Sequence, residues 1–414
     1  MENNLNYSAN EVLDVALEIG MNLLRSGAEI RRVEATISYI SKAYGAESVE
    51  VFAIPTLIIA TVNFEGASYT SKIKRNDAVN TDLYRLGKYN SLSRYIVKNK
   101  PPLAEVIEKI TAIQKRKDYN MILIYIGYII MASSFSMFFG GTFKDSLATM
   151  FVGFMMALSI RFTKLSYNQI LHNLIAAIVG GLVSIITYKI GLADNLGYVM
   201  IGGIMTIIPG LAIGTSIRDI MVDDVLSGSI RLFQATFTAA AIATGFAIWA
   251  IIFKVDASFM SDVSLLKMCI SALFGTLGYA IVFNNHYKHL LFVCIGGLIT
   301  TLIYGLLINY TNFGMFISVM LASLVGAIFS EILARVLKDP ATVFLLPTII
   351  PLVPGAMLFS TMYYLVLGLK DNSGLNDFWI SLSNTFLTSI AIAIGIVIVS
   401  VAIQIFYSHK KKKA

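Results

Sequence analysis

From Tyr119 onward the chain consists almost entirely of apolar segments separated by short polar loops. A bilayer whose hydrocarbon core is roughly 30 Å thick needs about 20 apolar residues for each helix that crosses it. Across the whole chain 56% of the residues are hydrophobic and only 14% are charged. These features predict a polytopic all-α membrane domain of about ten helices. The expected spans are residues 121–140, 146–161, 170–191, 196–215, 231–253, 264–284, 289–309, 313–336, 341–369 and 380–407.

Residues 1–118 carry an ordinary density of charge, so we expect a soluble domain in front of the membrane domain. Ser8 can cap a first helix that runs to about Arg25 and ends at Gly27. Alternating Val and Ile residues then predict strands, which makes this a small α+β domain. Its further elements are expected as helices over 29–44, 78–98 and 103–117 and strands over 49–54, 57–63 and 68–73.

The membrane part divides into a first module, residues 119–258, and a second module, residues 259–414. Residues 1–11 are polar, so no secretory signal is expected. Cys269 and Cys294 both lie within expected spans, where packing is a more usual role than a disulfide.

A Pro-Gly pair interrupts two of the expected spans. Pro209-Gly210 lies in the fourth span and Pro354-Gly355 lies in the ninth, and the two prolines are 145 residues apart. Proline destabilises a helix interior by roughly 3 kcal/mol and removes a hydrogen-bond donor. Lipid cannot bond the carbonyls that are set free, so such breaks survive only where protein or a water-filled cavity covers them. Paired broken helices in two halves of a chain therefore indicate the binding site of a transporter.

The two halves of the membrane part also match each other. Shifted by about 145 residues, the first five spans fall near the last five. Five spans per half is an odd number, so the halves would enter the membrane from opposite sides as a 5+5 inverted repeat. The alternative is a chance alignment of two apolar sequences. The Lys and Arg distribution, with the basic tail Lys410–Lys413, places both termini in the cytoplasm at the cell membrane.

Four charged residues follow the first Pro-Gly pair: Arg218, Asp219, Asp223 and Asp224. Asp219 and Asp223 are four apart, so one continuous helix would place them on the same face. The three acids could bind an amino group or carry a proton. The alternative is an ordinary cytoplasmic loop whose acids pair with Arg218 and Arg231.

Two further groups are candidates for a functional role. Glu331 and Arg335, near the inner end of the eighth span, could be a functional acid with its partner or a plain ion pair. In the soluble domain a small-molecule or regulatory site could form, and the alternative is a helix start with exposed ion pairs. The residues of that motif are Gly27, Glu29, Arg32, Glu34 and Thr56.

Catalysis has little support in the residue types. The soluble domain contains no His and no Cys, so neither a metal site nor a Ser/His/Asp triad is expected there. Acid/base work by Glu29 and Glu34 would be the remaining route. We expect no enzyme activity, no cofactor and no nucleic-acid partner.

Several of these stretches together resemble the threonine/serine exporter family, and the similarity covers nearly the whole chain. In some bacteria the two membrane modules of such proteins are separate chains, and a paired version is linked to succinate export. The segments that carry the resemblance are LLRSGAEIRRVE (Leu23–Glu34), IPT (Ile54–Thr56), FFGG (Phe138–Gly141), IIPGLAIGTSIRDIMVDDVLSG (Ile207–Gly228), FGTLGYAIVFN (Phe274–Asn284) and PTIIPLVPG (Pro347–Gly355).

The resemblance implies a secondary exporter in the cell membrane that moves threonine, serine or a related metabolite outward, driven by the proton motive force. One alternative is an exporter of succinate or another small dicarboxylate. Another is a membrane-bound hydrolase-like or sensor protein whose soluble domain gates a pore. Its partners would be the substrate, protons and lipid, and assembly into a homo-oligomer stays open. Within the matched motifs the transport residues would be Pro209, Gly210, Arg218, Asp219, Asp223, Pro354 and Gly355.

Overall fold

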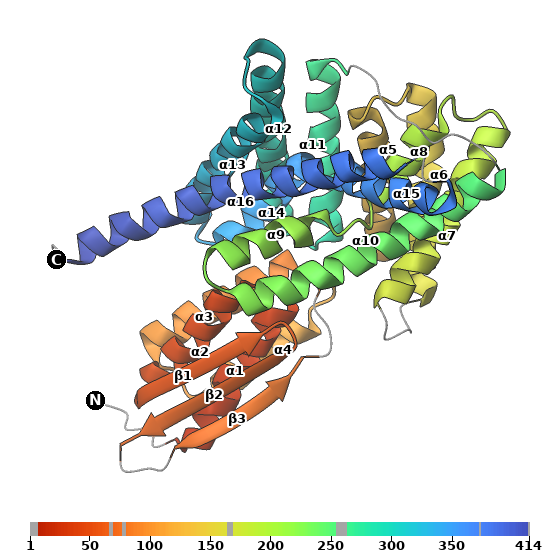
Figure 1. Ribbon diagram of the computed structural model, residues 1–414. Helices are drawn as coiled ribbons and strands as arrows, with labels where there is room; N and C mark the ends of the chain where they lie inside the picture. Colours follow the sequence, from red (N-terminus) through yellow and green to blue (C-terminus); the bar gives the residue numbers. More distant parts are fainter. Residues whose placement is uncertain are drawn as a thin grey trace.

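The computed structural model describes residues 7–65, 69–76, 80–163, 169–253, 263–371 and 374–412. A small α+β domain lies against one end of a larger helical domain (Figure 1). The elements of the small domain are α1 (Ala9–Arg25), α2 (Ile30–Ala43), β1 (Ala46–Ile54), β2 (Leu57–Phe64), β3 (Thr70–Arg75), α3 (Leu83–Asn99) and α4 (Leu103–Lys115).

Local sequence signals explain the small domain. Ser8 accepts a hydrogen bond from the Glu11 amide, and the Glu11 carboxylate bonds the Ser8 amide in return, so a capping box starts α1 as expected. The three strands form an antiparallel sheet in the order β1-β2-β3, in which Ala60 pairs with Val51 and Lys72. Buried apolar faces of α1 and α2 pack on this sheet and form the core. The expected α+β domain is therefore present.

Its third strand and third helix begin later than the sequence indicates. The strand begins at Thr70, and the first positions expected for it and for the 78–98 helix lie partly outside the described residues. The helix begins only at Leu83, because Asp82 accepts a hydrogen bond from the Arg85 amide at 2.8 Å and acts as its N-cap.

In its described residues the helical domain contains long apolar helices together with three short ones and two 3-10 turns. Long α10 and α16 cross it obliquely, whereas α11 and α12 stand upright in the view of Figure 1. Its elements are α5 (Met121–Phe138), α6 (Phe143–Thr163), α7 (Gln169–Lys189), α8 (Leu196–Ile204), α9 (Gly210–Met221), α10 (Val225–Phe253), α11 (Leu265–Val282), η1 (Tyr287–His289), α12 (Leu290–Tyr310), α13 (Met315–Leu337), α14 (Ala341–Ile349), η2 (Ile350–Leu352), α15 (Gly355–Asp371) and α16 (Leu375–Lys412).

Among the described residues, eight helices are long and apolar enough to cross a membrane, or nine if one bent pair counts as a span. That pair is α14 with η2 followed by α15, bent by 53° at the second Pro-Gly position. The expected span 196–215 is not among these helices, because the structure divides it into two short ones. Here α8 ends at Ile204 and α9 begins at Gly210, because Pro209 cannot donate the next helical hydrogen bond.

The helices of the two modules pack in a common pattern. In the first module α6 lies between α5 and α7, and α7 packs on α10. In the second module α12 lies between α11 and α13, and α13 packs on α16. The modules meet where α5 packs on α11, where α9 packs on α16 and where α10 packs on α15.

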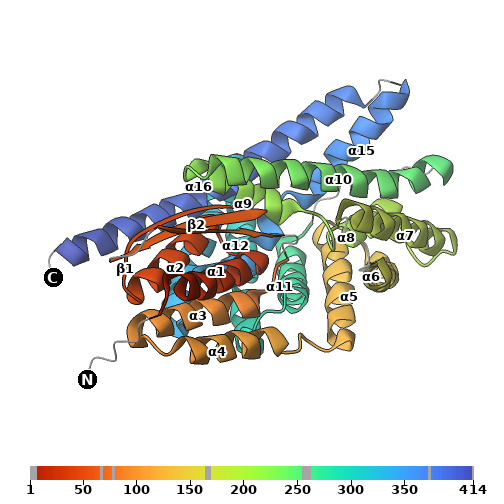
Figure 2. The same ribbon diagram turned by 90° about the horizontal axis from the view of Figure 1, so that it is seen from below.

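Seen from below, the small domain lies in front of the helical domain, with α5, α6 and α7 to its right (Figure 2). The first amides of α3 have no partners inside their own helix. Those of Leu83 and Tyr84 donate to the carbonyls of Phe283 and Asn284, just beyond the end of α11, at 2.9 and 3.1 Å. The N-terminus of α3 is therefore hydrogen-bonded to the C-terminal end of α11, and this fixes the small domain against the helical domain.

Candidate functional site

The two Pro-Gly breaks touch each other inside the helical domain. A Cβ atom added to Gly210 would lie 2.2 Å from Cγ1 of Val353, a distance that side chains do not tolerate. A Cβ atom added to Gly355 would lie 2.6 Å from the sulfur of Met205. A side chain at Gly210 would therefore require the β-branched Val353 to move, whereas at Gly355 the flexible Met205 side chain would have to give way.

Each proline leaves a backbone carbonyl without its helical partner. One of these carbonyls is bonded by the other module and one by a turn of its own segment. In a continuous helix the Met205 carbonyl would accept from residue 209, which is a proline and has no N–H. The hydroxyl of Tyr279, from α11 of the other module, donates to that carbonyl instead. At the second break the Val353 amide closes a 3-10 turn on the Ile350 carbonyl at 3.0 Å. The breaks thus satisfy their backbone groups with protein, as an apolar surrounding demands.

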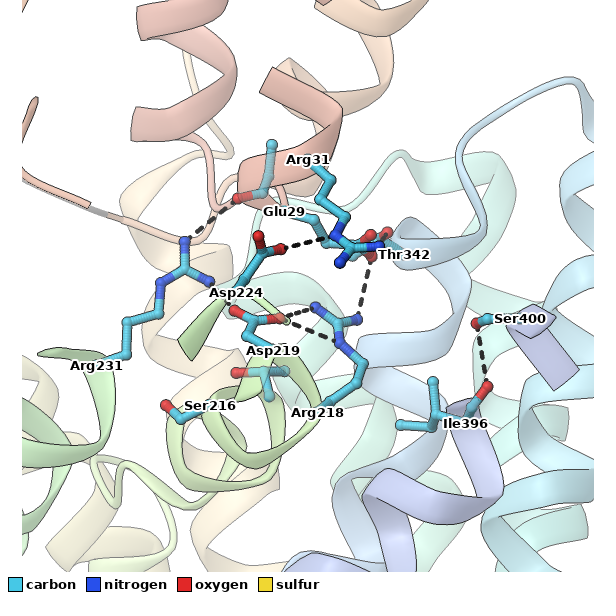
Figure 3. Close-up of polar contacts among 12 residues, drawn as sticks. Glu29, Arg31, Ser216, Arg218, Asp219, Asp224, Arg231, Thr342, Ile396 and Ser400 are labelled. Carbon is cyan, nitrogen blue, oxygen red and sulfur yellow. Dashed lines mark hydrogen bonds and ion pairs between the residues drawn. The ribbon is translucent and has the colours of Figure 1, made fainter. Parts of the chain in front are cut away.

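A network of ion pairs, the ion network, joins Glu29 in the small domain to α9, the helix that begins at the first Pro-Gly break (Figure 3). Asp219, on α9, accepts from Arg218 at 2.8 Å and from Arg231 at 3.0 Å. Arg218 also donates to Oε1 of Glu29, in the soluble domain, at 3.1 Å. Thr342, at the start of α14, donates to the same oxygen at 3.0 Å. Glu29 is therefore held by both membrane modules at once.

The network is mostly shielded from water. The side chains of Asp219, Arg218 and Arg231 are 4%, 9% and 15% exposed, while that of Glu29 is 33% exposed. The charge of Arg218 lowers the pKa of Glu29 to about 2, and outweighs burial, which by itself would raise it. Glu29 is consequently ionised near neutral pH.

A cavity of about 290 Å³ extends from this network to the first break. A smaller cavity of about 40 Å³ between the two breaks shares Ile208, Leu211 and Phe283 with it. The lining residues of the larger cavity are Gly27, Glu29, Pro55, Thr81, Gln169, Asn173, Ile207, Ile208, Pro209, Leu211, Ala212, Thr215, Arg218, Arg231, Gln234, Ala235, Thr238, Phe283, Thr342 and Leu346.

The three acids after the first break do not act as a group. Because α9 ends at Met221 and Asp223 has a left-handed backbone (φ 69°), Asp219 and Asp223 do not share a helix face, and that prediction was wrong. The Asp223 side chain is 99% exposed, 3.9 Å from Arg31. Asp224 pairs with Arg31 at 3.3 Å. Of the three, Asp219 belongs to the ion network.

In the described part of the chain, the remaining candidate residues from the sequence do not line the large cavity. Glu331 and Arg335 form an ion pair of 3.7 Å on α13 and are not among the described residues that line the cavity. Neither are Arg32, Glu34 and Thr56 of the soluble motif.

These three soluble-domain residues have local surroundings of their own. Glu34 accepts from the Ala53 amide at 2.9 Å, and Thr56 is exposed in the turn between β1 and β2. The Nε atom of Arg32 is buried without a hydrogen-bond partner among the described residues.

Sequence reasoning missed Thr342 and the role of Tyr279. Tyr279 lies within a stretch that we had singled out, FGTLGYAIVFN, but nothing local marks its hydroxyl as the partner of a carbonyl 74 positions away. Thr342 and Glu29 are 313 positions apart. Only the folded chain brings these groups together.

Comparison with known proteins adds the family. The family model described as "Putative threonine/serine exporter" matches residues 14–253, which is more than half of the chain. The chain belongs to the threonine/serine exporter family. A second model of this family, described as "Threonine/Serine exporter, ThrE", matches residues 268–402. The two matches fall on the first and second membrane modules, and the first includes most of the soluble domain.

A curated relative is the threonine/serine exporter of Corynebacterium glutamicum, which is 23% identical over 243 residues. The matched region is 56% of this chain and 50% of that protein, so the chain spans about half the length of this relative. No solved structure matches the chain. Family membership and the eight or nine apolar helices make this a multi-pass membrane protein of a transporter family rather than an enzyme family.

Proposed function

We propose that the protein is a secondary transporter that exports threonine or serine from the cytoplasm, driven by the proton motive force. The observation that carries the proposal is the contact between the two Pro-Gly breaks at the inner end of a charged cavity. Broken helices at the contact of two modules are the usual place of a transporter's substrate site. Alternating access would then proceed by movement of one module against the other around this contact.

The charges around the cavity favour a zwitterion. Glu29 and Asp219 balance Arg218 and Arg231, so the network is neutral as a whole. Both hydrogen bonds that Glu29 accepts within the described chain end on Oε1, which leaves Oε2 for a substrate ammonium. A dicarboxylate such as succinate would bring two negative charges to a site that already holds two acids. A small neutral amino acid therefore fits better than a dicarboxylate.

The cavity also offers groups for the rest of such a substrate. The amides at the start of α9 can hold a carboxylate where the helix begins at Gly210. Thr215 and Thr238 line the cavity; their hydroxyls donate to carbonyls of their own helices and can still accept from a substrate hydroxyl. Gly210 and Arg218 are roughly 12 Å apart along α9. We therefore place two successive substrate positions along the cavity, one at Glu29 and one at the break.

We further propose that the modules are an inverted repeat. First, α8 and α14 begin at Leu196 and Ala341, and α9 and α15 begin at Gly210 and Gly355, so both pairs are 145 residues apart. Second, each contact within the first module has its counterpart in the second, and α9 packs on α16 as α15 packs on α10. Swapped contacts of this kind are expected where two copies of one motif pack around an axis between them.

The direction of the helices supports inversion. Lys267, early in α11, donates to the Gly141 carbonyl beyond the end of α5 at 2.7 Å. Tyr119, before the start of α5, donates to the Asn285 carbonyl beyond the end of α11 at 2.6 Å. The first helices of the two modules thus run antiparallel, as an inverted repeat requires.

In the proposed arrangement residues 1–118 form a cytoplasmic domain, and both termini lie in the cytoplasm. The broken α8–α9 segment then provides the tenth passage, since α9 ends beside the soluble domain, where Arg218 meets Glu29. The basic tail expected to anchor this side, Lys410–Lys413, has side chains that lie outside the described residues.

For the proton we propose Asp224 in place of Asp223. Burial and the neighbouring Asp219 raise the pKa of Asp224, although Arg31 opposes them, and a raised pKa suits a group that binds and releases protons. The Asp224→Asn variant should still move substrate down its gradient but should lose its response to the proton gradient. Uncoupler-sensitive efflux of normal rate in this variant would exclude Asp224 as the carrier.

The test of the function is efflux of preloaded radiolabelled threonine, serine and succinate from cells that express the chain, with and without an uncoupler. Cells with an empty vector are the control. We expect uncoupler-sensitive efflux of threonine or serine. Efflux of succinate alone would overturn the assigned substrate class, and efflux insensitive to the uncoupler would indicate a passive pore.

A further inference from the structure

A second cavity lies at the junction between the soluble domain and the membrane helices, apart from the candidate substrate site. It has a volume of about 200 Å³, is open to one side, and is lined by residues of α3 and η1 and by Leu337, Asp339 and Val343. Lys88, Lys288, His286 and His289 line it, with Asp339 as the one acidic residue among its described lining residues. Neither the ion network nor the Pro-Gly breaks contribute to it, so substrate transport as proposed above leaves this cavity unexplained.

Its positive charge is not balanced by the protein. Neither Lys88 nor Lys288 has an acidic partner within 4.0 Å in the described part of the chain. Arg116 lies 3.1 Å from the centre of the Tyr84 ring, which also lines the cavity, and adds a further positive charge beside it. Burial lowers the pKa of His286, and the positive charges of Lys88, Arg116 and Lys288 lower it further. Unpaired basic groups around a cavity favour a negatively charged occupant.

The ring of His289 lies at the edge of this cavity and is mostly buried. The side chain of His289 is only 8% exposed, and its Nε2 atom lies 3.3 Å from the Asp339 carboxylate. Its Nδ1 atom is buried and has no hydrogen-bond partner among the described residues. With the Nε2–H facing the Asp339 carboxylate, Nδ1 of the neutral ring is an acceptor, so it would take a donor and not the oxygen of an anion. His289 and Asp339 therefore form a pair of their own beside the two lysines.

The wall of the cavity is held by specific contacts. The rings of Tyr84 and His286 are stacked, 5.5 Å apart and inclined by 18°. A Cβ atom on Gly87 would lie 3.1 Å from an oxygen of Asp339, so glycine lets α3 approach the membrane domain closely. The α3–α11 hydrogen bonds of Leu83 and Tyr84 hold the same junction. Packing and hydrogen bonds thus hold the backbone of the segments that carry Lys88 and Lys288.

We propose that this cavity binds an anion that carries a phosphate group, through Lys88 and Lys288. It lies where the soluble domain meets the ends of the membrane helices, and basic pockets at that level of a membrane protein bind lipid headgroups. A free phosphate compound of the cytoplasm would present the same chemistry. The bound anion would bridge α3 to η1 and stabilise the docking of the soluble domain.

The experiment measures the thermal unfolding of the purified full-length protein, delipidated in a neutral detergent. The added probes are inorganic phosphate, a short-chain phosphatidylglycerol and, as the neutral comparison, a short-chain phosphatidylcholine. A ligand that binds only the folded state raises the unfolding temperature with its concentration. We expect phosphatidylglycerol to raise it and phosphatidylcholine to have little effect. An equal rise with inorganic phosphate would show that the phosphate group alone is sufficient.

Two charge-matched variants decide whether the cavity is responsible. In Lys88→Gln/Lys288→Gln the apparent affinity should fall about tenfold or more, because two charge-assisted hydrogen bonds are lost. Lys42→Gln/Lys98→Gln removes the same charge from exposed positions of the soluble domain outside this cavity and should behave like the wild type. The proposal is overturned if no anionic probe shifts the unfolding temperature, or if both double variants respond as the wild type does. All lysines concerned are exposed, so neither variant should fail to fold.

Discussion

At the scale of the residue, Asp219 is the acid on which the ion network depends. Its carboxylate forms ion pairs with Arg218 and Arg231. Without it, Glu29 would be the remaining acid of the network for these two buried guanidinium groups. Removing one member of a buried charge pair costs about 3–5 kcal/mol. We expect Asp219→Asn to lower stability by about 3 kcal/mol and to abolish efflux.

Asp223→Asn is the matched control for this change. Its carboxylate is exposed, and asparagine tolerates the left-handed backbone found there, so stability should change by less than about 0.5 kcal/mol. Thermal unfolding and threonine efflux of both variants test the assignment. Equal losses in the two variants would contradict the distinction between the acids.

The pKa of Glu29 predicts how the stability of the protein depends on pH. The pKa of Glu29 in the folded protein is about 2, below its ordinary value of 4.5, so its stabilisation is fully present above pH 4.5 and is lost as pH falls toward about 2. We expect Glu29→Gln to be less stable than the wild type by about 1–2 kcal/mol near neutral pH, with allowance for its partial exposure. The difference in unfolding temperature should narrow at about pH 3. A difference that stays constant with pH would rule out the ionised carboxylate as its source.

At the scale of the element, the contact between the two broken helices can be tested at Gly210. Alanine there would clash with Val353, so Gly210→Ala should destabilise the protein by about 1–3 kcal/mol and slow efflux. Adding Val353→Ala should restore part of both, because the clash is removed. Gly214→Ala, on the same helix, meets nothing within 4 Å and should be neutral or slightly stabilising. Absence of any rescue by Val353→Ala would show that the helices are not in contact in the working protein.

A variant at Tyr279 tests how the backbone carbonyl at the first break finds its hydrogen-bond partner. Tyr279→Phe keeps the ring but leaves the Met205 carbonyl without the hydroxyl that replaces the missing proline N–H. An unsatisfied buried carbonyl costs about 1–3 kcal/mol. We expect lower thermal stability, with faster hydrogen exchange at the amides around the first break. An unchanged exchange pattern would show that this hydroxyl does not stabilise the break.

At the scale of the whole molecule, the proposed orientation can be tested with introduced cysteines. The native Cys269 and Cys294 are both buried and should not react with an impermeant thiol reagent. Tyr39, on the soluble domain, and Asn312, in the loop between α12 and α13, are both exposed. In intact cells Asn312→Cys should be labelled, and Tyr39→Cys should be labelled only after permeabilisation. The reverse pattern would invert the topology and turn the proposed export into uptake.

The features predicted well are those whose cause is local in sequence. Ser8 and Glu11 form a cap within one turn, and Pro209 and Pro354 break their helices because proline lacks an N–H wherever it stands. The sequence did not predict where α9 ends. Asp223 has a left-handed backbone, and the residues around it give no signal for that conformation. The prediction that Asp219 and Asp223 share a face failed for this reason.

Sequence by itself determined that this chain crosses a membrane, where its helices break and which family it resembles. Hydropathy, proline chemistry and motifs act within a few residues, so a linear reading detects them. Tertiary structure alone decided that Glu29 meets Arg218, 189 positions away, and that the Pro-Gly breaks lie against each other. Such contacts depend on how helix ends and a separate domain pack, and packing is a property of shape that no single segment contains.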